Sequence, residues 1–222
     1  KVKKKVILFG LGDFSRIAFL YLQRSSEFEV VAFTVHSQFI QAPLFMDKPV
    51  VPFETVSNEF PVTDFRMFVA IGFKNLNKAR SEIYHQCKSK GYELITYVSP
   101  HAFVFDQSCL GDNCFVFENN VIQPGVKIGN DVIIWSGNHI GHDATIGDHT
   151  FISSHVVVSG HVKIGERCFV GVNSAFKDSI TIGNDCLIGA GSLILKDAAD
   201  ASVFKGTPAE LSAVPSNRLR GI

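Results

Sequence analysis

Histidines are the residues of this chain best suited to move a proton at neutral pH, and five of them lie close together in its second half. They are His139, His142, His149, His155 and His161. An imidazole titrates near neutrality, so each could serve as a general base toward an attacking amine or hydroxyl. His142 stands in the segment IGHDATIG and is followed directly by an acid, Asp143. Which of the five could do chemistry depends on the elements that position them.

The segment that carries these histidines has a period of six residues. Every sixth position from Val104 to Ile194 is apolar, and nearly all of these residues are aliphatic. A glycine often follows the apolar residue, and the fourth position after it is mostly small. An α-helix requires a period of about 3.6 and an ordinary strand a period of about 2, so neither explains the pattern.

A prism-shaped solenoid does explain the pattern. A short strand directs one aliphatic side chain inward, the chain turns a corner, and three such faces complete a coil of about 18 residues. The aliphatic positions fill the axis, the small positions pack at the corners, and glycine allows backbone conformations that a Cβ would hinder. Cys114, Cys168 and Cys186 fall at small positions and are predicted to be core residues. The period never slips, which rules out an extruded loop between Val104 and Ile194.

The length of a coil also predicts neighbours between coils. Stacked strands lie about 4.8 Å apart, so residues about 18 positions apart are expected to lie one above the other. By this rule His161 stacks next to Asp143, and Gly160 stacks next to His142. His161 could therefore compete with His142 for Asp143 or share its proton, and the sequence leaves both alternatives open.

Residues 5–100 carry a different signal, that of alternating strands and helices. The pattern predicts, in order, a strand through Phe9, a helix from about Ser15, a strand over Phe28–Val35, a strand over Phe65–Gly72, a helix over 78–91 and a strand over 92–98. These βαβ units predict a small parallel sheet of Rossmann type. The turn after the first strand, which contains Gly10 and Gly12, is a natural anion site beside a helix N-terminus.

The glycine fingerprint of a dinucleotide site is incomplete in this turn. GLGDFS supplies Gly10 and Gly12 but ends in Ser15 rather than in a third glycine. Val35 and His36 end the second strand, where a dinucleotide site would have a carboxylate for the ribose. An NAD-dependent enzyme is therefore disfavoured, and no metal site is predicted.

The order of the two halves resembles one family of enzymes. A short Rossmann-like domain passes through a SPHA segment, Ser99–Ala102, into the hexapeptide repeats. This arrangement is similar to the sugar acyltransferases that include the sialic acid O-acetyltransferases and the bacillosamine-pathway and perosamine N-acetyltransferases. The resemblance implies an α/β, Rossmann-like domain over residues 1–100 that holds a nucleotide-linked sugar. It further implies a left-handed parallel β-helix over residues 101–197 that holds acetyl-CoA, and a tail over residues 198–222 that closes the CoA site.

The same resemblance implies a catalytic pair and an assembly. GHD, residues 141–143, is similar to the family's EHD or EHE segment, which makes His142 the general base and Asp143 the acid that orients it and raises its basicity. Gly141 departs from the acidic residue that usually precedes the histidine. The other four histidines of the repeats match no catalytic position of the family. The family also implies a homotrimer with a role in bacterial surface glycan biosynthesis, including lipopolysaccharide and O-antigen.

Ligand contacts are implied in both halves. For the nucleotide sugar, the resemblance points to Gly10, Gly12, Asp13, Phe14, Ser15, Val35, His36, Gly72 and Phe73. Phe14 stands where relatives commonly have a histidine. For acetyl-CoA it implies a groove between neighbouring subunits, with contacts at Gly160, Asp178, Gly189, Ala190, Lys196, Lys205 and Pro208. The segment Gly206–Ala209 resembles the GxPA segment by which many such enzymes close the CoA site.

Composition narrows the setting in which such an enzyme would act. The 222 residues contain 21 Lys and Arg against 21 Asp and Glu, which disfavours a binder of nucleic acid. No segment has the roughly 18 uncharged apolar residues of a membrane span, and the first apolar run is interrupted by glycines, as in a strand rather than a signal peptide. Five cysteines without a CxxC pair indicate reduced thiols. We therefore expect a soluble, cytoplasmic protein with no membrane insertion.

Together these features predict an acetyl-CoA-dependent N-acetyltransferase that acts on a nucleotide-linked amino sugar. Two alternatives remain at this point. One is a sugar O-acetyltransferase, since the sequence does not distinguish an amine acceptor from a hydroxyl. The other is a catalytically inert β-helix that binds a sugar nucleotide, and the GHD segment and the GTPA tail argue against it.

Overall fold

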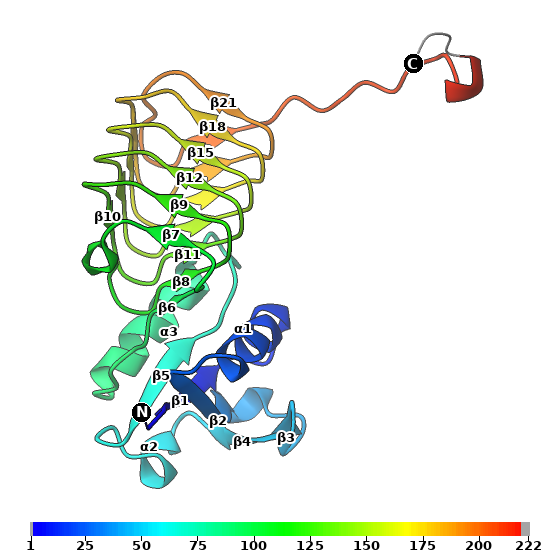
Figure 1. The fold of residues 1–222 in the computed structure, drawn as a ribbon. Coiled ribbons are helices and arrows are strands. Elements are labelled where there is room, and N and C mark those ends of the chain that lie inside the picture. The colour runs from blue at the N-terminus through cyan, green and yellow to red at the C-terminus, as the bar shows by residue number, and fades with distance from the viewer. Residues whose placement is uncertain (1, 219–222) are drawn as a thin grey trace.

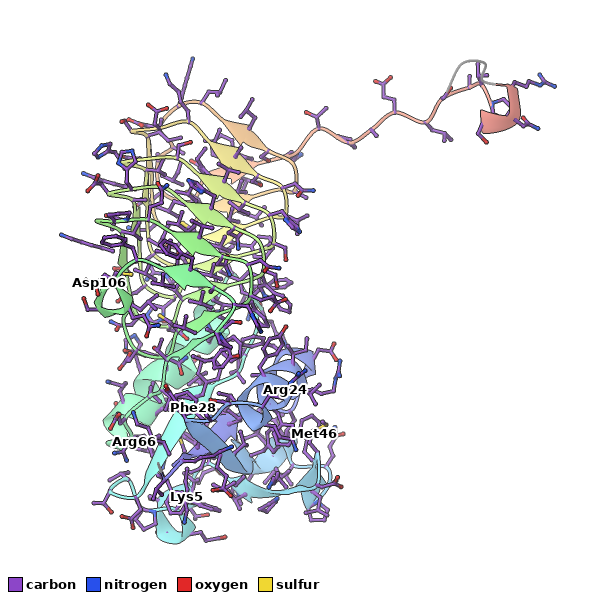
Figure 2. All side chains as sticks on the ribbon, in the orientation of Figure 1. Lys5, Arg24, Phe28, Met46, Arg66 and Asp106 are labelled. Atoms are coloured by element: carbon purple, nitrogen blue, oxygen red, sulfur yellow. The ribbon has the colours of Figure 1, made fainter. Side chains whose placement is uncertain are left out.

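The computed structural model describes residues 2–218, which form two domains. Figure 1 shows an α/β domain at one end of a long prism of stacked coils, with the C-terminal segment extending away from the far end of the prism. Side chains fill the interior of the prism and of the α/β domain (Figure 2). Among the described residues, no helix is long and apolar enough to cross a membrane.

The first domain is a five-stranded sheet with helices. Its elements are β1 (Lys4–Phe9), α1 (Asp13–Gln23), β2 (Phe28–Val35), η1 (Ser37–Phe39), β3 (Leu44–Phe45), β4 (Lys48–Pro52), α2 (Val56–Glu59), β5 (Phe65–Val69) and α3 (Lys78–Ser89). The strand order is β3-β4-β2-β1-β5, and only β3 runs antiparallel to its neighbour. The order β4-β2-β1-β5 is that of one half of a doubly wound sheet. A parallel bridge between Met67 and Leu94 extends this sheet beyond β5.

The predicted strands and helices of this domain are confirmed, with two differences. Strand β4 and its short hairpin partner β3 were not predicted, because prolines at positions 43, 49 and 52 interrupt the apolar pattern. The segment predicted as one strand over residues 92–98 is divided. Leu94 joins the first sheet, whereas β6 (Tyr97–Val98) pairs with β8 in the second domain.

The second domain is a parallel β-helix with three faces. The seven-stranded face contains β6, β8 (Phe115–Val116), β11 (Ile133–Ile134), β14 (Phe151–Ile152), β17 (Phe169–Val170), β20 (Leu187–Ile188) and β22 (Val203–Phe204). The six-stranded face contains β7 (Phe103–Val104), β9 (Val121–Ile122), β12 (His139–Ile140), β15 (Val157–Val158), β18 (Ala175–Phe176) and β21 (Leu193–Ile194). The four-stranded face contains β10 (Lys127–Ile128), β13 (Thr145–Ile146), β16 (Lys163–Ile164) and β19 (Thr181–Ile182). Short 3-10 turns, η2 (Gln107–Cys109) and η3 (Ser216–Arg218), lie outside these faces.

The register of the coils follows the six-residue period. Ile134 pairs with Ile152, and Ile146 pairs with Ile164, so each strand lies 18 residues from its neighbour in the stack. The second residue of each strand points into the axis, where the aliphatic side chains form one continuous core. Cys114, Cys168 and Cys186 are fully buried and free, as predicted from their small positions.

The corners correct one prediction about glycine. The left-handed backbone conformation falls three residues after each core position, not one, and is adopted by Asn113, Asn119, Gly125, Asp131, Gly137, Asp143, His149, His155, His161, Arg167, Asn173, Ser179, Asp185 and Gly191. Asn, Asp and His tolerate this region better than most residues. The glycines that directly follow the core residues serve close stacking instead. A Cβ at Gly141 would lie 2.7 Å from the backbone nitrogen of Gly160 in the next coil.

The β-helix extends beyond both predicted ends. It begins with β6, and after Ile194 the chain adds one further partial coil, because Ala198 bridges Ile182 and Val203 pairs with Leu187. Val203 lies 16 positions after Leu187 rather than 18, so this last coil is two residues shorter than the others. The period therefore holds through Ile194, as predicted, and changes only in the segment expected to be a tail.

The first domain packs on the seven-stranded face. Outward-facing Phe115, Ile133 and Phe151 of that face belong to the same core as the sheet and α1. A polar network lies beside this core. The fully buried Arg80 of α3 contacts Asp131 through Nε at 3.1 Å and donates to the carbonyl oxygen of His149 at 2.6 Å. Because these bonds cross between domains, they fix the orientation of one domain on the other.

Candidate active site

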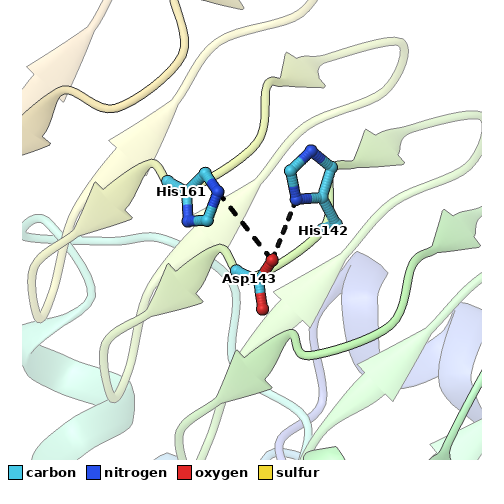
Figure 3. A group of neighbouring side chains, drawn as sticks. All are labelled: His142, Asp143 and His161. Atoms are coloured by element: carbon cyan, nitrogen blue, oxygen red, sulfur yellow. Dashed lines mark hydrogen bonds and ion pairs between the residues drawn. The ribbon is translucent and has the colours of Figure 1, made fainter.

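His142 and Asp143 form a hydrogen-bonded pair at one corner of the prism. This corner joins the six-stranded face to the four-stranded face, and we call it the His142 corner, residues 141–144 with the segments stacked on them. The Nδ1 atom of His142 lies 2.9 Å from Oδ2 of Asp143 (Figure 3). A neutral ring that donates from Nδ1 keeps an unprotonated Nε2, which is the form that a general base requires.

The backbone of the corner is held by the coils on both sides. Asp143 adopts φ 57°, and its backbone nitrogen donates to the carbonyl oxygen of Pro124 in the preceding coil. The backbone nitrogen of His142 donates to the side-chain oxygen of Gln123 at 2.9 Å, and its carbonyl oxygen accepts from His161. The pair therefore stands on a rigid backbone, although its side chains are exposed.

Two glycines leave room for the pair. A Cβ at Gly160 would lie 2.6 Å from Nε2 of His142, so the imidazole occupies the space that a side chain would take. A Cβ at Gly125, which has φ +75°, would overlap the carboxylate of Asp143. Gly160 was predicted to stack beside His142, and the structure confirms that position. Gly125 was not singled out, although it lies 18 residues before Asp143 and the same rule identifies it.

His161 approaches the same carboxylate from the next coil. Its Nε2 lies 3.9 Å from Oδ2 of Asp143, beyond hydrogen-bond distance, and its ring is perpendicular to that of His142 with 4.9 Å between centroids. Asp143 is thus bonded to His142 and faces His161 at longer range. The hydrogen bond from His142, followed by the charge of His161, holds the pKa of Asp143 below its usual range. The carboxylate is ionised at neutral pH and can stabilise a protonated imidazole.

The other histidines of the repeats lie in different surroundings. His149 is buried and bonds Oδ2 of Asp131 through Nδ1 at 2.7 Å, within the network of Arg80. His155 occupies an exposed corner on the other side of the six-stranded face, above Gly137. His139 points outward from β12. Among these five histidines, all within the described residues, only His142 lies within hydrogen-bond distance of an exposed acid.

The residues expected to contact a nucleotide sugar gather at one edge of the first sheet. Strands β1, β2 and β5 are parallel, so their carboxyl ends meet there. Gly10 has φ +126°, and a Cβ on it would lie 2.8 Å from the carbonyl oxygen of Ala70. Gly12 precedes α1, and no atom lies within 4 Å of the position that its Cβ would take. The turn is therefore narrow at Gly10 and open at Gly12, with the amides of the α1 N-terminus beside it.

Not all of these side chains face that edge. Phe14 is buried at the domain junction and contacts Phe68, Phe115, Phe117 and Trp135, so its ring serves packing and the prediction of a ligand contact by this side chain is not supported. Ser15 is also buried, and its hydroxyl donates to the carbonyl oxygen of Gly10 at 2.7 Å. Val35 is buried as well. Asp13 is exposed, and so is Phe73, whose ring packs on Phe169 of the β-helix.

The second strand carries no carboxylate at this edge, and Glu54 supplies one from another segment. Glu54 follows β4, and its Oε1 lies 3.1 Å from Nδ1 of His36. Its Oε2 accepts from the backbone nitrogen of Ser37 at 3.1 Å. The sequence showed no acid at Val35 or His36, and Glu54 was missed because the strand that carries it to the edge was not predicted.

The residues expected to contact acetyl-CoA lie on two corners. Gly160, Asp178 and Lys196 follow His142 at intervals of one coil and stack on the His142 corner. Gly189 and Ala190 lie on the corner between the seven-stranded and six-stranded faces, which we call the Glu118 corner after Glu118 in its first coil. Lys205 and Pro208 follow β22, where the chain leaves the coils (Figure 1). A single chain therefore does not bring the two sets together.

A separate groove lies between the first domain and the first coil. It encloses about 900 Å³ and is lined among others by Tyr21, Arg24, His101 and Glu118. Tyr21 donates to Glu118 at 2.8 Å, and burial together with this bond raises the pKa of Tyr21 to about 12. The groove faces the C-terminal end of α1, whereas the glycine turn lies at its N-terminus, and none of the predicted site residues lines it.

The repeats match known protein families. Residues 110–142 and 127–160 match the bacterial transferase hexapeptide family, described as six repeats, and residues 161–196 match the hexapeptide repeat of succinyl-transferase. No curated protein sequence matches the chain significantly.

Solved structures match over nearly the whole chain. One is a histidine-to-asparagine mutant of perosamine N-acetyltransferase from Caulobacter crescentus in complex with CoA and GDP-perosamine, at 27% identity and TM-score 0.81, covering 95% of this chain and 97% of that one. The acetyltransferase domain of PglB from Neisseria gonorrhoeae, in complex with acetyl coenzyme A, matches at 23% identity and TM-score 0.82, covering 94% and 99%. WeeI from Acinetobacter baumannii matches at 17% identity and TM-score 0.77, covering 94% and 99%. At these lower identities, the last two comparisons show a shared fold only.

These findings define the class of the protein. Its β-helix matches models of hexapeptide-repeat transferases over the coils from 110 to 196. The full-length match at 27% identity to an N-acetyltransferase, in both domains and in the same order, indicates that the chain is an acetyltransferase.

Proposed function

We propose that this protein transfers an acetyl group from acetyl-CoA to the amino group of a nucleotide-linked amino sugar. The observation that carries the proposal is the pair of His142 and Asp143, bonded at 2.9 Å and seated over a glycine on a hexapeptide corner. The similarity to perosamine N-acetyltransferase supports an amine as the acceptor rather than a hydroxyl. It also supports CoA and a sugar nucleotide as the two ligands.

In the proposed reaction His142 acts on the proton of the acceptor. The thioester supplies an activated carbonyl carbon, to which the amine nitrogen adds before the carbon–sulfur bond breaks. Nε2 of His142 takes the proton that the nitrogen loses, and the protonated ring can return it to the leaving thiolate. Asp143 keeps Nδ1 protonated and stabilises the imidazolium, since its own carboxylate stays ionised.

The edge of the first domain has the features of a diphosphate site. Gly12 leaves open space beside the amides that begin α1, and an anion at a helix N-terminus is stabilised by those amides and by the helix dipole. Glu54 lies beside His36 at the end of the second strand, where a carboxylate can accept from ribose hydroxyls. We therefore place the nucleotide part of the acceptor at this edge.

The proposed nucleotide site and the His142 corner lie on different sides of the prism in one chain. The first domain covers the seven-stranded face and reaches the corners that flank it, through Tyr21 and Glu118 on one side and through Arg80 and Asp131 on the other. The His142 corner is the third corner, opposite the covered face. A second copy of the chain is therefore needed to bring an acceptor held by a first domain to His142.

The six-stranded face supports assembly into a homotrimer. Its outward residues are mostly apolar and exposed, as at Phe103, Val157 and Leu193, whereas the four-stranded face presents Lys and Thr. Three copies with their six-stranded faces toward a threefold axis would place the Glu118 corner of one copy beside the His142 corner of the next. That arrangement would join the two sets of residues expected to contact acetyl-CoA in one groove between subunits.

The proposed function is tested with nucleotide amino sugars and acetyl-CoA, by following release of the free thiol. His142→Ala should lower kcat by about 10² to 10⁴, the usual contribution of a general base. The matched control is His85→Ala, which changes an exposed histidine on α3, away from both of these corners. A His142→Ala protein with native circular dichroism and wild-type kcat would overturn the assignment of the base. Turnover only of sugars with a hydroxyl acceptor would instead favour O-acetylation.

A further inference from the structure

His142, Asp143 and His161 together have the donor set of a transition-metal site. Two imidazole nitrogens and one carboxylate oxygen lie within 4.8 Å of one another. Figure 3 shows both rings directed at the same carboxylate oxygen, from two neighbouring coils. Mixed nitrogen and oxygen ligands of this kind suit Zn²⁺, whereas Mg²⁺ prefers oxygen ligands alone. The geometry points to a Zn²⁺ site built on the proposed catalytic pair.

The distances fit a tetrahedral ion after small side-chain movements. Bonds of about 2.0 to 2.2 Å place two ligand atoms of a tetrahedral zinc about 3.3 Å apart. The distance from Nδ1 of His142 to Oδ2 of Asp143 is 2.9 Å, and that from Nε2 of His161 to the same oxygen is 3.9 Å. The first pair opens by about 0.4 Å and the second closes by about 0.6 Å to reach the required value. The two imidazole nitrogens, which lie within 4.8 Å of each other, close by up to about 1.5 Å through rotation of the side chains.

The three side chains are free to make this adjustment. Their exposed fractions are 56% for His142, 52% for Asp143 and 59% for His161. The backbone that carries them is held by hydrogen bonds between coils, including the one from His161 to the carbonyl oxygen of His142. Solvent can supply the fourth ligand, so the site is open in the manner of three-ligand zinc sites.

Zinc at this position would block the proposed base. Coordination of Nδ1 replaces its hydrogen bond to Asp143, and a neutral imidazole with a metal on Nδ1 has its proton on Nε2. Nε2 is the atom that must be unprotonated to accept a proton from the acceptor amine. The structure therefore assigns to this corner an inhibitory Zn²⁺ site. The inhibition rests on the proposed function, whereas the binding of zinc does not.

The site is tested on the full-length chain without an affinity tag, first by direct binding. Calorimetric titration should show Zn²⁺ binding in a ratio of one per chain and no binding of Mg²⁺, and Co²⁺ should give the intense visible absorption of a tetrahedral complex. His161→Gln should weaken Zn²⁺ binding at least about tenfold, since even partners outside the ligand shell contribute that much. His85→Gln, which changes an exposed histidine on α3 away from both corners, is the matched control and should bind as the wild type does. Absence of binding, or equal binding by His161→Gln and the wild type, would overturn the inference.

The second measurement is inhibition, with each variant compared with its own rate after treatment with EDTA. Wild-type turnover should fall as Zn²⁺ is added and recover with EDTA, and His161→Gln should need at least about tenfold more Zn²⁺ for the same loss. Zinc binding with unchanged turnover would overturn the inhibitory role. Failure to find any acetyl transfer in metal-free protein would count against the proposed function alone, since the binding experiment does not depend on it.

Discussion

Replacing Gly160 by alanine tests whether the position of the His142 ring controls catalysis. A Cβ at Gly160 would lie 2.6 Å from Nε2 and 2.7 Å from Cε1 of that ring. Ordinary contact begins at 3.4 Å, so the ring must retreat by about 0.8 Å. A displacement of about 1 Å in a reacting group can cost about 10² in rate. We therefore expect kcat to fall about 100-fold, equivalent to about 2.7 kcal/mol in activation free energy.

The fold should tolerate this change, because the atoms in conflict belong to an exposed side chain and Gly160 does not have a positive φ. Gly171→Ala provides the contrast. There the Cβ would lie 2.6 Å from the backbone nitrogen of Ala190, which cannot move without disturbing the coil. Gly160→Ala should lose kcat with little change in Tm, and Gly171→Ala should lose Tm. Steady-state kinetics and thermal unfolding measure both effects, and a Gly160→Ala enzyme with wild-type kcat would refute the argument.

Three further changes test the junction, the acceptor site and the assembly. Arg80→Met leaves the buried carboxylate of Asp131 without its arginine and should lower the free energy of unfolding by about 3 to 5 kcal/mol, seen as a fall in Tm of about 6 to 20 °C. The control Arg167→Met, at a partly exposed ion pair, should cost about 1 kcal/mol or less. Equal losses of stability in the two variants would contradict the role of the buried network. Gly12→Val should raise KM for the nucleotide sugar more than KM for acetyl-CoA. Its Tm should not fall, because no atom lies within 4 Å of the position of the added Cβ. Equal rises in the two KM values, measured with both substrates varied, would move the acceptor site elsewhere. Val157→Asp places a charge on the six-stranded face and should yield smaller particles by light scattering with lower activity, whereas an unchanged mass would exclude that face as the contact between copies.

The β-helix and the neighbours within the His142 corner could be predicted because both depend on local repetition. A strict period fixes which residues point inward, and the length of a coil fixes which residues stack, so Gly160 and His161 could be placed beside His142 and Asp143 before the structure was known. The role of the glycines could not be read from the same pattern. A glycine in a repeat can serve a positive φ or a close approach, and only the stacked backbones decide between them.

The contacts that the sequence did not reveal are those between distant segments. Phe14 follows the glycine turn, and its position suggested a ligand contact, yet the apolar spacing of Phe14, Ala18 and Leu22 on α1 already indicated a buried face. Glu54 reaches the rim of the sheet only because β4 pairs with β2. The burial of Arg80 could not be predicted locally, since the carboxylate that neutralises it, Asp131, lies 51 residues away in the β-helix.

The proposed division of the site over two corners follows from the same domain junction. The first domain needs a large apolar surface, and the aromatic ladder of the seven-stranded face provides it, which leaves the opposite corner free of contacts within the chain. His142 and Asp143 on that free corner are open to solvent, and the first domain of their own chain covers the opposite face. Assembly through the six-stranded face would then do more than stabilise an apolar surface. It would bring an acceptor held by one copy within reach of His142 in the next copy. Activity should therefore depend on protein concentration in the range in which the copies dissociate.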